Sequence, residues 1–287
     1  MIFNLCILKI FLLCTSIISA VKFSINFNSD ESDKLRSLIG AVSFPKDIEC
    51  SKRNVNKYFE VLQVDEKNEE LLDAQFKTIY AKYKDNDHTL IVIHRGSKDD
   101  VQIRRQFFSA MNPMKKYNNY GSIWDYPYYS FNSIKSKCSS RIKEMKFKHF
   151  TKFIFIGCSL GGNLAALDAL NCFDLKICTQ FNTKVISFGS PKIGDLFFVG
   201  AYNSRIPNTY RIAFRDDLIR IFPFDLKYYS IGKAIFLQDE RYNICTPDND
   251  DPICHSEESM WQQISNGLSA FQKHLKLHGE YCDNRCE

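Results

Sequence analysis

The sequence predicts an α/β fold in which helices cover both faces of a mostly parallel sheet. Strand-like apolar runs alternate with helical patterns along residues 131–215, which is typical of this class. With 287 residues, of which 45% are apolar, the chain is long enough to bury a full core. It contains no internal repeat and no low-complexity linker. We therefore expect a single folded domain.

The first third of the chain has the least regular pattern. Residues 21–75 have a mostly helical pattern without clear boundaries between elements. Residues 76–83 alternate as a strand does, and residues 90–93 form a second, fully apolar strand. The polar residues 85–87 between them favour a turn, so the pattern predicts a hairpin. Residues 98–130 are irregular and rich in aromatic side chains.

From residue 131 onward the elements are easier to assign. The sequence predicts a helix at 131–146, a strand at 152–158, a helix at 160–171, a strand at 184–188, a helix or loop from Pro191, and a strand at 209–215. The first of these helices has an apolar side formed by Phe131, Ile134, Cys138, Ile142 and Met145. Its opposite side carries Lys135, Lys137, Arg141, Lys143 and Lys146. We interpret that basic side as solvated, with attraction to an anionic membrane surface as the alternative.

The amino terminus has the pattern of a targeting segment. Residues 2–20 are mostly apolar, are interrupted by Lys9 and end in Ser19 and Ala20. This stretch is too short and too broken for a comfortable membrane span. We expect residues 1–20 to be a secretory signal peptide and residues 21–287 to form the domain of a secreted protein. An uncleaved anchor or a buried first helix is the alternative.

Cysteine usage agrees with export. Of the eleven cysteines, nine follow the predicted signal peptide, and an odd number requires a free thiol or a bridge to another chain. We expect Cys158 to be the free thiol, because a small apolar side chain suits the sheet core at that position. The remaining eight cysteines allow up to four bridges. Spacing favours two pairings, Cys245 with Cys254, and Cys50 with either Cys282 or Cys286.

The net charge argues against one class of partner. A formal charge of +5 is only a mild excess over 287 residues. Nothing in the sequence resembles a nucleic-acid-binding module, and the lysines lack interleaved aromatic side chains. We therefore expect no nucleic acid as a partner.

The most informative motif places a serine between glycines directly after a strand. Ser159 lies in the run Gly157-Cys158-Ser159-Leu160-Gly161-Gly162, which follows the apolar residues 153–156. A strand-to-helix turn this tight leaves no room for side chains two residues before and after the serine. The pattern is that of a nucleophile elbow, in which the serine hydroxyl is pushed outward. We therefore predict that Ser159 is a catalytic nucleophile.

A serine hydroxyl needs a base and an orienting carboxylate before it attacks an ester. In elbow folds these partners follow the serine in the order acid, then histidine. Asp217 comes directly after the predicted strand 209–215, at the sheet edge where such sites form. Asp217 is the predicted acid, and Asp216 is the alternative.

Six histidines compete for the role of base. His88, His94 and His149 precede the serine, and His255 adjoins Cys254 in a loop that we expect to be bounded by a disulfide. His274 and His278 remain, at the end of an apolar helical pattern.

The oxyanion of an acyl-transfer intermediate needs two hydrogen-bond donors. The backbone N–H of Leu160, next to the nucleophile, supplies one of them. The second should come from a loop after an earlier strand, and the residues that follow strand 90–93 fit that place. Within them Gly96 permits a sharp turn, and Ser97 offers both an N–H and a hydroxyl group.

Four features together resemble the class 3 lipase family, the fungal-type triacylglycerol lipases. They are the run Arg95-Gly96-Ser97, the elbow at residues 157–162, the run at residues 187–195, and Asp217 ahead of Phe222-Pro223. The resemblance spans about residues 76–286. It implies an α/β hydrolase fold in which Ser159, Asp217 and His274 form the catalytic triad. It also implies that Ser97 and Leu160 form the oxyanion hole.

The resemblance favours His274 because His274-Leu275, followed by Gly279, fits the closing motif of the family. Residues 98–111 read as a short amphipathic helix with Val101, Phe107, Phe108 and Met111 on one side. In the family this segment would be a lid, and a plain surface helix is the alternative.

These residues lead to a functional expectation. We expect a monomeric, secreted serine lipase or esterase that hydrolyses acylglycerols at an oil–water or membrane interface through an acyl-enzyme. The chemistry requires no metal and no cofactor, so we expect neither. One alternative keeps the chemistry on phospholipids or on short-chain or aryl esters. The other alternative is a non-catalytic secreted protein that binds lipid or a host surface.

Overall fold

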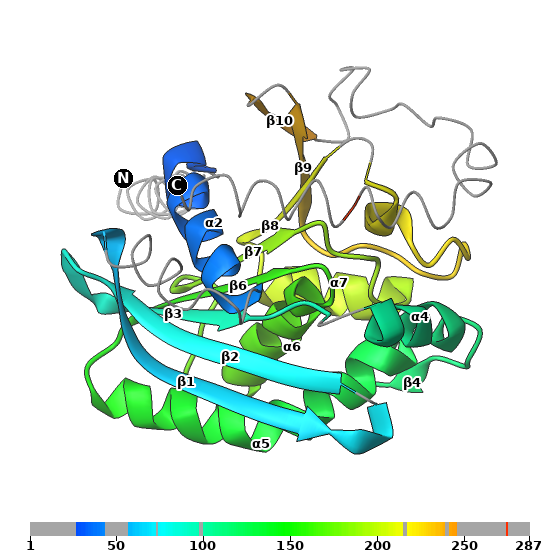
Figure 1. The fold of residues 1–287 in the computed structure, drawn as a ribbon, viewed down its shortest axis with the longest axis horizontal. Helices are drawn as coiled ribbons and strands as arrows, with labels where there is room; N and C mark the ends of the chain where they lie inside the picture. Colours follow the sequence, from blue (N-terminus) through cyan, green and yellow to red (C-terminus); the bar gives the residue numbers. More distant parts are fainter. Residues whose placement is uncertain are drawn as a thin grey trace, which may run out of the picture.

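The computed structural model describes residues 27–43, 57–72, 74–97, 100–214, 217–238, 241–245 and residue 274. Its centre is an eight-stranded sheet with the strand order β1-β2-β3-β6-β7-β8-β9-β10 (Figure 1). The central strands β3, β6, β7, β8 and β9 run parallel, and antiparallel strands extend both edges. The predicted fold class, a mostly parallel sheet with flanking helices, is confirmed.

The elements have the following bounds. The strands of the large sheet are β1 (Phe59–Glu69), β2 (Ala74–Tyr83), β3 (Asn86–His94), β6 (Lys152–Cys158), β7 (Thr183–Phe188), β8 (Thr209–Phe214), β9 (Lys233–Gln238) and β10 (Arg241–Cys245). A separate pair is formed by β4 (Lys115–Lys116) and β5 (Ser122–Ile123). The helices are α2 (Ser29–Ser43), α4 (Asp100–Ser109), α5 (Asp125–Phe147), α6 (Leu160–Asp174) and α7 (Leu196–Arg205), with short 3₁₀ turns η1 (Glu70–Leu72) and η2 (Leu218–Ile221).

Helices cover both faces of the sheet, as predicted. Helix α2 lies on one face, and α5, α6 and α7 lie on the other (Figure 1). Successive residues of β3 pack into the cores on opposite faces of the sheet. Leu90 belongs to the core under α5 and α6, whereas Ile91 belongs to the core under α2. Each fully buried aliphatic side chain contributes roughly 1.5–3 kcal/mol to folding. This double burial explains why the central strands are apolar throughout.

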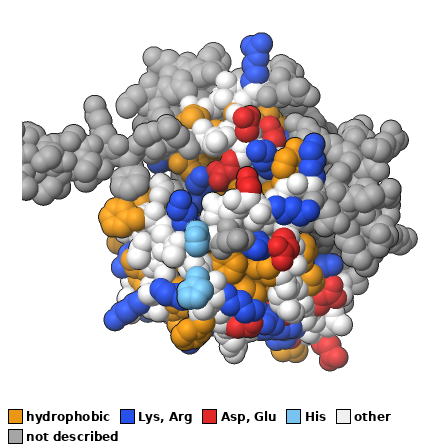
Figure 2. All heavy atoms as spheres, turned by 90° about the vertical axis from the view of Figure 1, so that its left-hand side faces the viewer, with side chains coloured by type: hydrophobic (Ala, Val, Ile, Leu, Met, Phe, Trp, Pro, Cys, Tyr) orange, Lys and Arg blue, Asp and Glu red, His pale blue; other side chains and the backbone are white. Residues whose placement is uncertain are grey.

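Helix α5 has the sidedness that its sequence predicts, although it begins at Asp125 rather than at residue 131. All five residues of its predicted apolar side are buried. On the basic side, Arg141 and Lys137 approach the Asp65 carboxylate of β1 at 3.2 and 3.6 Å. Part of the basic side therefore ties the helix to the edge strand. On the face that Figure 2 shows, Lys and Arg side chains lie among acidic and hydrophobic ones.

Strand β1 corrects the prediction that residues 21–75 are mostly helical. Residues 29–43 form helix α2, but residues 59–69 form an edge strand that pairs with β2. Only Phe59 and Asp65 of this strand are buried. A strand with so little buried surface has no apolar alternation, and its sequence therefore lacked the signal of a strand. Strands β9 and β10 were also not predicted.

The hairpin prediction is confirmed by β2 and β3, which pair antiparallel with Ile79 opposite Ile93. Both strands are longer than predicted, because β2 begins at Ala74 and β3 spans residues 86–94. This places His88 in β3 rather than in the turn. Strand β6 has the predicted bounds, and β7 and β8 each differ from theirs by one residue.

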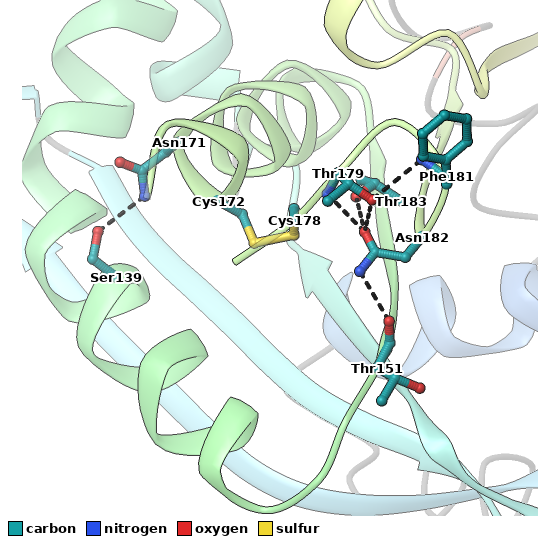
Figure 3. The surroundings of a disulfide bond; sticks show 9 residues. All are labelled: Ser139, Thr151, Asn171, Cys172, Cys178, Thr179, Phe181, Asn182 and Thr183. Carbon is teal, nitrogen blue, oxygen red and sulfur yellow. Dashed lines mark hydrogen bonds between the residues drawn. A yellow bond between two sulfur atoms is a disulfide. The ribbon is translucent and has the colours of Figure 1, made fainter. Parts of the chain in front are cut away.

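A disulfide joins Cys172 near the end of α6 to Cys178 in the following loop (Figure 3). In the same loop, the side-chain carbonyl of Asn182 accepts hydrogen bonds from the backbone N–H and the hydroxyl of Thr179. The Asn182 amide donates to the carbonyl of Thr151, ahead of β6. The disulfide and these hydrogen bonds fix the crossover between α6 and β7.

The other described cysteines give a mixed result. Cys158 forms no disulfide, as predicted, but Cys138, which we expected among the bridged cysteines, forms none either. Cys138 is buried on the inner side of α5, where the described residues include no other cysteine in reach. Cys245 is disulfide-bonded. Residues 50, 254, 282 and 286, which complete the pairings favoured by spacing, lie outside the described residues.

None of the described helices combines the length and the apolar character that crossing a bilayer requires. The predicted signal peptide at residues 1–20 lies outside the described part of the chain.

Candidate active site

The nucleophile elbow has the backbone geometry that its sequence predicts. Ser159 stands between β6 and α6 with φ 53° and ψ −128°. Residues other than glycine rarely adopt a positive φ, and the backbone strain of this conformation persists only where the surroundings enforce it. Here the N–H of Ser159 donates to the carbonyl of Phe188 on β7 at 2.8 Å. The turn therefore presents the serine at the carboxyl end of β6.

The glycines of the elbow are required by close approach. A Cβ atom at Gly157 would overlap the carbonyl of Gly161, the second residue of α6. A Cβ at Gly161 would overlap the carbonyl of His94 on β3, and a Cβ at Gly162 would overlap the hydroxyl of Ser190. Helix α6 thus packs directly on the backbones of its neighbours. The steric argument made from the sequence is confirmed at Gly157 and Gly161, and Gly162 is a further position of close approach.

The structure brings together the predicted acid and the predicted base. The Nδ1 atom of His274 lies 2.8 Å from both carboxylate oxygens of Asp217. Both side chains are buried, with 2% and 0% of their surface exposed. Asp217 is itself fixed, because its carboxylate accepts a hydrogen bond from the N–H of Ile219 at 3.0 Å. The carboxylate holds Nδ1, so Nε2 is the ring nitrogen that can exchange a proton with a hydroxyl group.

This pair lies at the sheet edge that also carries the elbow. Asp217 follows β8, and Ser159 follows β6, and both strands run parallel in the same sheet. The two alternatives, Asp216 and His278, lie outside the described residues. The elbow and the predicted acid–base pair therefore lie at the same edge of the sheet.

A cavity of about 270 Å³ lies at the other edge of the sheet, where Tyr83, Lys152 and Lys184 are among its lining residues.

The predicted oxyanion loop lies directly against the elbow. A Cβ atom at Gly96 would approach the Cys158 carbonyl to 2.7 Å and the Ser159 Cβ to 3.4 Å. Arg95 anchors the loop to β2, because its backbone N–H donates to the Lys77 carbonyl at 3.0 Å. Its guanidinium group also donates to Gln75. The glycine therefore permits a contact between loop and nucleophile that any side chain would block.

Ser97 and Leu160 are the residues from which we predict the oxyanion donors. Leu160 is the first residue of α6, directly after the nucleophile, and it is buried. The hydroxyl of Ser97 accepts a hydrogen bond from the amide of Gln106 on α4. Sequence reasoning missed Gln106. Its only signal was the helical spacing of three polar residues, Gln102, Gln106 and Ser109, which are all buried.

Helix α4 confirms the helix predicted within residues 98–111. The helix buries that polar side, while Phe108 and Met111 are 67% and 77% exposed. The side chains of Val101 and Phe107 lie outside the described residues. The indole N–H of Trp124 donates to the Ser109 hydroxyl at 2.8 Å and so holds the end of α4 against α5. The predicted apolar side, as far as it is described, faces away from the protein.

The run at residues 187–195 has a structural role. The Asp195 carboxylate caps α7 by accepting from the N–H of Phe198 at 2.8 Å, and it also accepts from the N–H of Ser122 on β5. Burial and the neighbouring Arg211 lower the pKa of Lys192. Burial likewise lowers the pKa of Arg211 to about 10. The hydrogen bonds of Asp195 fix the loop beside the elbow.

Fold and site together define an α/β hydrolase that carries a serine nucleophile elbow. Residues 91–227 match the family described as Lipase (class 3). The matched range contains Ser97, Ser159, Leu160 and Asp217, whereas His274 lies beyond it.

Relatives agree with this assignment. The protein Lipase ZK262.3 of Caenorhabditis elegans is 24% identical over 138 residues, which cover 47% of this chain and 38% of the relative. The match thus spans well under half of that relative. The triacylglyceride lipase of Rhizomucor miehei superposes with a TM-score of 0.67 at 17% identity, covering 86% of this chain and 92% of that one. Lipase II of Rhizopus niveus gives 0.65 at 14% identity, covering 76% and 84%. At these identities the solved structures show a shared fold.

Proposed function

We propose that the chain is a secreted serine lipase that hydrolyses acylglycerol esters through a Ser159–His274–Asp217 triad. The observation that carries the proposal is the buried hydrogen bond between His274 and Asp217 at the sheet edge that also bears the strained serine. A histidine held by a carboxylate is the base that a serine nucleophile requires. The match of residues 91–227 to the class 3 lipase family supports the same activity.

In the proposed mechanism Ser159 Oγ attacks the ester carbonyl carbon, and Nε2 of His274 takes the hydroxyl proton. The carbonyl oxygen becomes an oxyanion, which accepts hydrogen bonds from the N–H of Leu160 and from Ser97. When the intermediate collapses, the bond to the alcohol breaks, and the alcohol takes the proton from His274. Water then attacks the acyl-enzyme with the same histidine as base and releases the fatty acid. Asp217 stabilises the imidazolium form and does not itself take the proton.

The exposed apolar side chains of α4 support a lipid substrate. Phe108 and Met111 stand out from the helix that contacts the oxyanion loop through Gln106 and Ser97. Exposed apolar groups beside a site mark a surface that contacts lipid or a partner. The basic side of α5 gives less support to a phospholipid substrate, because Arg141 and Lys137 are engaged with Asp65 of the same chain.

Export is part of the proposal. It is supported by the apolar segment at residues 2–20 and by the Cys172–Cys178 disulfide, which is typical of oxidising compartments. Amino-terminal sequencing of protein collected from culture medium tests it, and we expect the chain to begin near residue 21. We further propose that the protein acts as a monomer, which sedimentation analysis checks.

A substrate panel tests the activity. Wild-type protein and the Ser159→Ala variant would be compared on emulsified triacylglycerol, phospholipid vesicles and soluble short-chain esters. We expect the wild type to be fastest on the emulsion and the variant to be inactive on all three. Preference for vesicles would favour a phospholipase instead, and preference for the soluble substrates an esterase. Lipid binding without hydrolysis by the wild type would favour the non-catalytic alternative and overturn the proposal.

A further inference from the structure

Three potential metal ligands from three different elements meet in the core, apart from the triad. His94 ends β3, Cys138 lies on α5, and Asp168 lies on α6. One ligand atom from each residue lies within 4.8 Å of the other two. None of the three residues is more than 2% exposed. Their sequence positions are up to 74 residues apart, so only the fold brings them together.

The cluster leaves polar atoms that the protein itself does not satisfy. Asp168 Oδ2 lies 3.0 Å from His94 Nε2, but Asp168 Oδ1 has no hydrogen-bond partner among the described residues. The hydroxyl of Tyr80 contacts the thiol of Cys138 and has no nitrogen or oxygen partner there. A buried carboxylate with an unsatisfied oxygen costs several kcal/mol unless a cation or another donor compensates for it. Such an atom calls for an explanation.

The orientation of the imidazole adds a second, independent observation. Nδ1 of His94 lies 3.2 Å from the hydroxyl of Thr78, which fixes the ring with Nε2 directed at Asp168. Histidines that bind a metal through one ring nitrogen usually hold the other by a hydrogen bond of this kind. Thr78 therefore occupies the position of a residue that orients a metal-binding histidine by a hydrogen bond.

We propose that His94, Cys138 and Asp168 bind one zinc ion that fastens β3, α5 and α6 to one another. Imidazole nitrogen, thiolate sulfur and carboxylate oxygen are the donors that zinc takes in proteins. A neutral imidazole, a thiolate and a carboxylate together carry two negative charges, which a divalent cation neutralises. Tetrahedral bonds of about 2.0–2.3 Å place ligand atoms roughly 3.3–3.8 Å apart, so small side-chain shifts suffice. The Tyr80 hydroxyl or a water molecule would complete the coordination.

Zinc at this place would be structural, because the cluster is buried. It accounts for the unsatisfied Asp168 oxygen and for the buried thiol of Cys138, which forms no disulfide. From the sequence we expected no metal, since the chemistry at Ser159 needs none. The site does not depend on the proposed function.

Metal content is the direct test. The full chain would be produced with a tag that contains no histidine, dialysed against metal-free buffer, and measured by plasma mass spectrometry. We expect about one zinc per chain in the wild type. We expect Cys138→Ser and Asp168→Asn to hold less than a tenth of that amount. Cys158→Ser, which removes the other described cysteine outside a disulfide, is the matched control and should keep its zinc.

Two further measurements keep the test decisive if a variant fails to fold. A strong chelator should lower the thermal midpoint of the wild type by several degrees, and added zinc should restore it. Wild-type protein loaded with cobalt should show a thiolate-to-metal charge-transfer band. Wild-type protein that holds no zinc even when produced with added zinc would overturn the proposal. Zinc that persists in folded Cys138→Ser and Asp168→Asn proteins would overturn it as well.

Discussion

The molecule contains two buried histidine–aspartate pairs that look alike and differ in their surroundings. His274 and Asp217 are 2.8 Å apart, and His94 and Asp168 are 3.0 Å apart. In both pairs the carboxylate is fully buried and the imidazole is at most 2% exposed. The first pair lies beyond the end of β8, at the edge that carries the nucleophile elbow. The second lies between β3 and α6, inside the core.

The difference lies in the third group that each pair meets. At the sheet edge we propose that this third group is the hydroxyl of Ser159, a residue with positive φ that is only partly buried. In the core it is the thiol of Cys138, which is 2% exposed and which no substrate reaches. A buried histidine–aspartate pair is therefore no signature of catalysis by itself. We propose that the accessible nucleophile assigns the first pair to catalysis, whereas the second pair stabilises the core.

Removal of the nucleophile should have the largest effect on the sheet-edge site. We expect Ser159→Ala to lower kcat about a millionfold, the scale seen when a triad nucleophile is removed. The thermal midpoint should stay within a few degrees, because the change removes one partly exposed hydroxyl. Initial rates on an ester substrate, with circular dichroism as the folding control, measure both. A variant that keeps near-normal turnover would contradict the assignment.

Neutralising the acid of the same pair should have the second largest effect. We expect Asp217→Asn to lower kcat about ten-thousandfold, because an amide favours the wrong tautomer of His274. The affinity for substrate, read as KM, should change little. A loss of less than tenfold in a folded protein would show that Asp217 does not orient the base.

The matching change in the core pair should act on stability. We expect Asp168→Asn to lower the free energy of unfolding by about 3–5 kcal/mol, since removal of one buried partner leaves the other uncompensated. Denaturant titration measures this loss. Equal stabilities of the Asp168→Asn and wild-type proteins would mean that this pair does not hold β3 to α6.

The smallest effect should come from the exposed side of α4. We expect Phe108→Ser combined with Met111→Ser to lower the rate on emulsified lipid about tenfold, because less apolar surface remains to bind the interface. The rate on a soluble ester should stay unchanged. Phe147→Ser, which alters another exposed aromatic residue at the end of α5, is the matched control. Equal losses on both substrates would argue against an interfacial role for this helix.

The sequence predicted the parts of the structure that depend on local pattern. Strand β6 and the elbow were readable because an apolar run meets glycines that only one kind of turn requires. The pairing of Asp217 with His274 followed from chain order and from the class 3 lipase resemblance. Gly157 and Gly161 proved to be close-contact positions, as the steric argument demands.

Other parts could not be read because they depend on contacts between distant residues. Strand β1 is polar along most of its length, so its sequence carries no alternation. The bond from Gln106 to Ser97 and the meeting of His94, Cys138 and Asp168 exist only after the sheet and its helices assemble. His94 was considered only as a base, and Cys138 as part of the apolar side of a helix and as a disulfide partner. No local pattern distinguishes such groupings from ordinary buried polar residues.

Labelling with a fluorophosphonate probe, followed by peptide mass spectrometry, tests the central claim most directly. An activated serine reacts with the probe, and an ordinary serine does not. We expect a single modified residue, Ser159, in the wild type, and no modification in folded His274→Ala protein. Absence of label on wild-type Ser159, or full labelling without His274, would contradict the account.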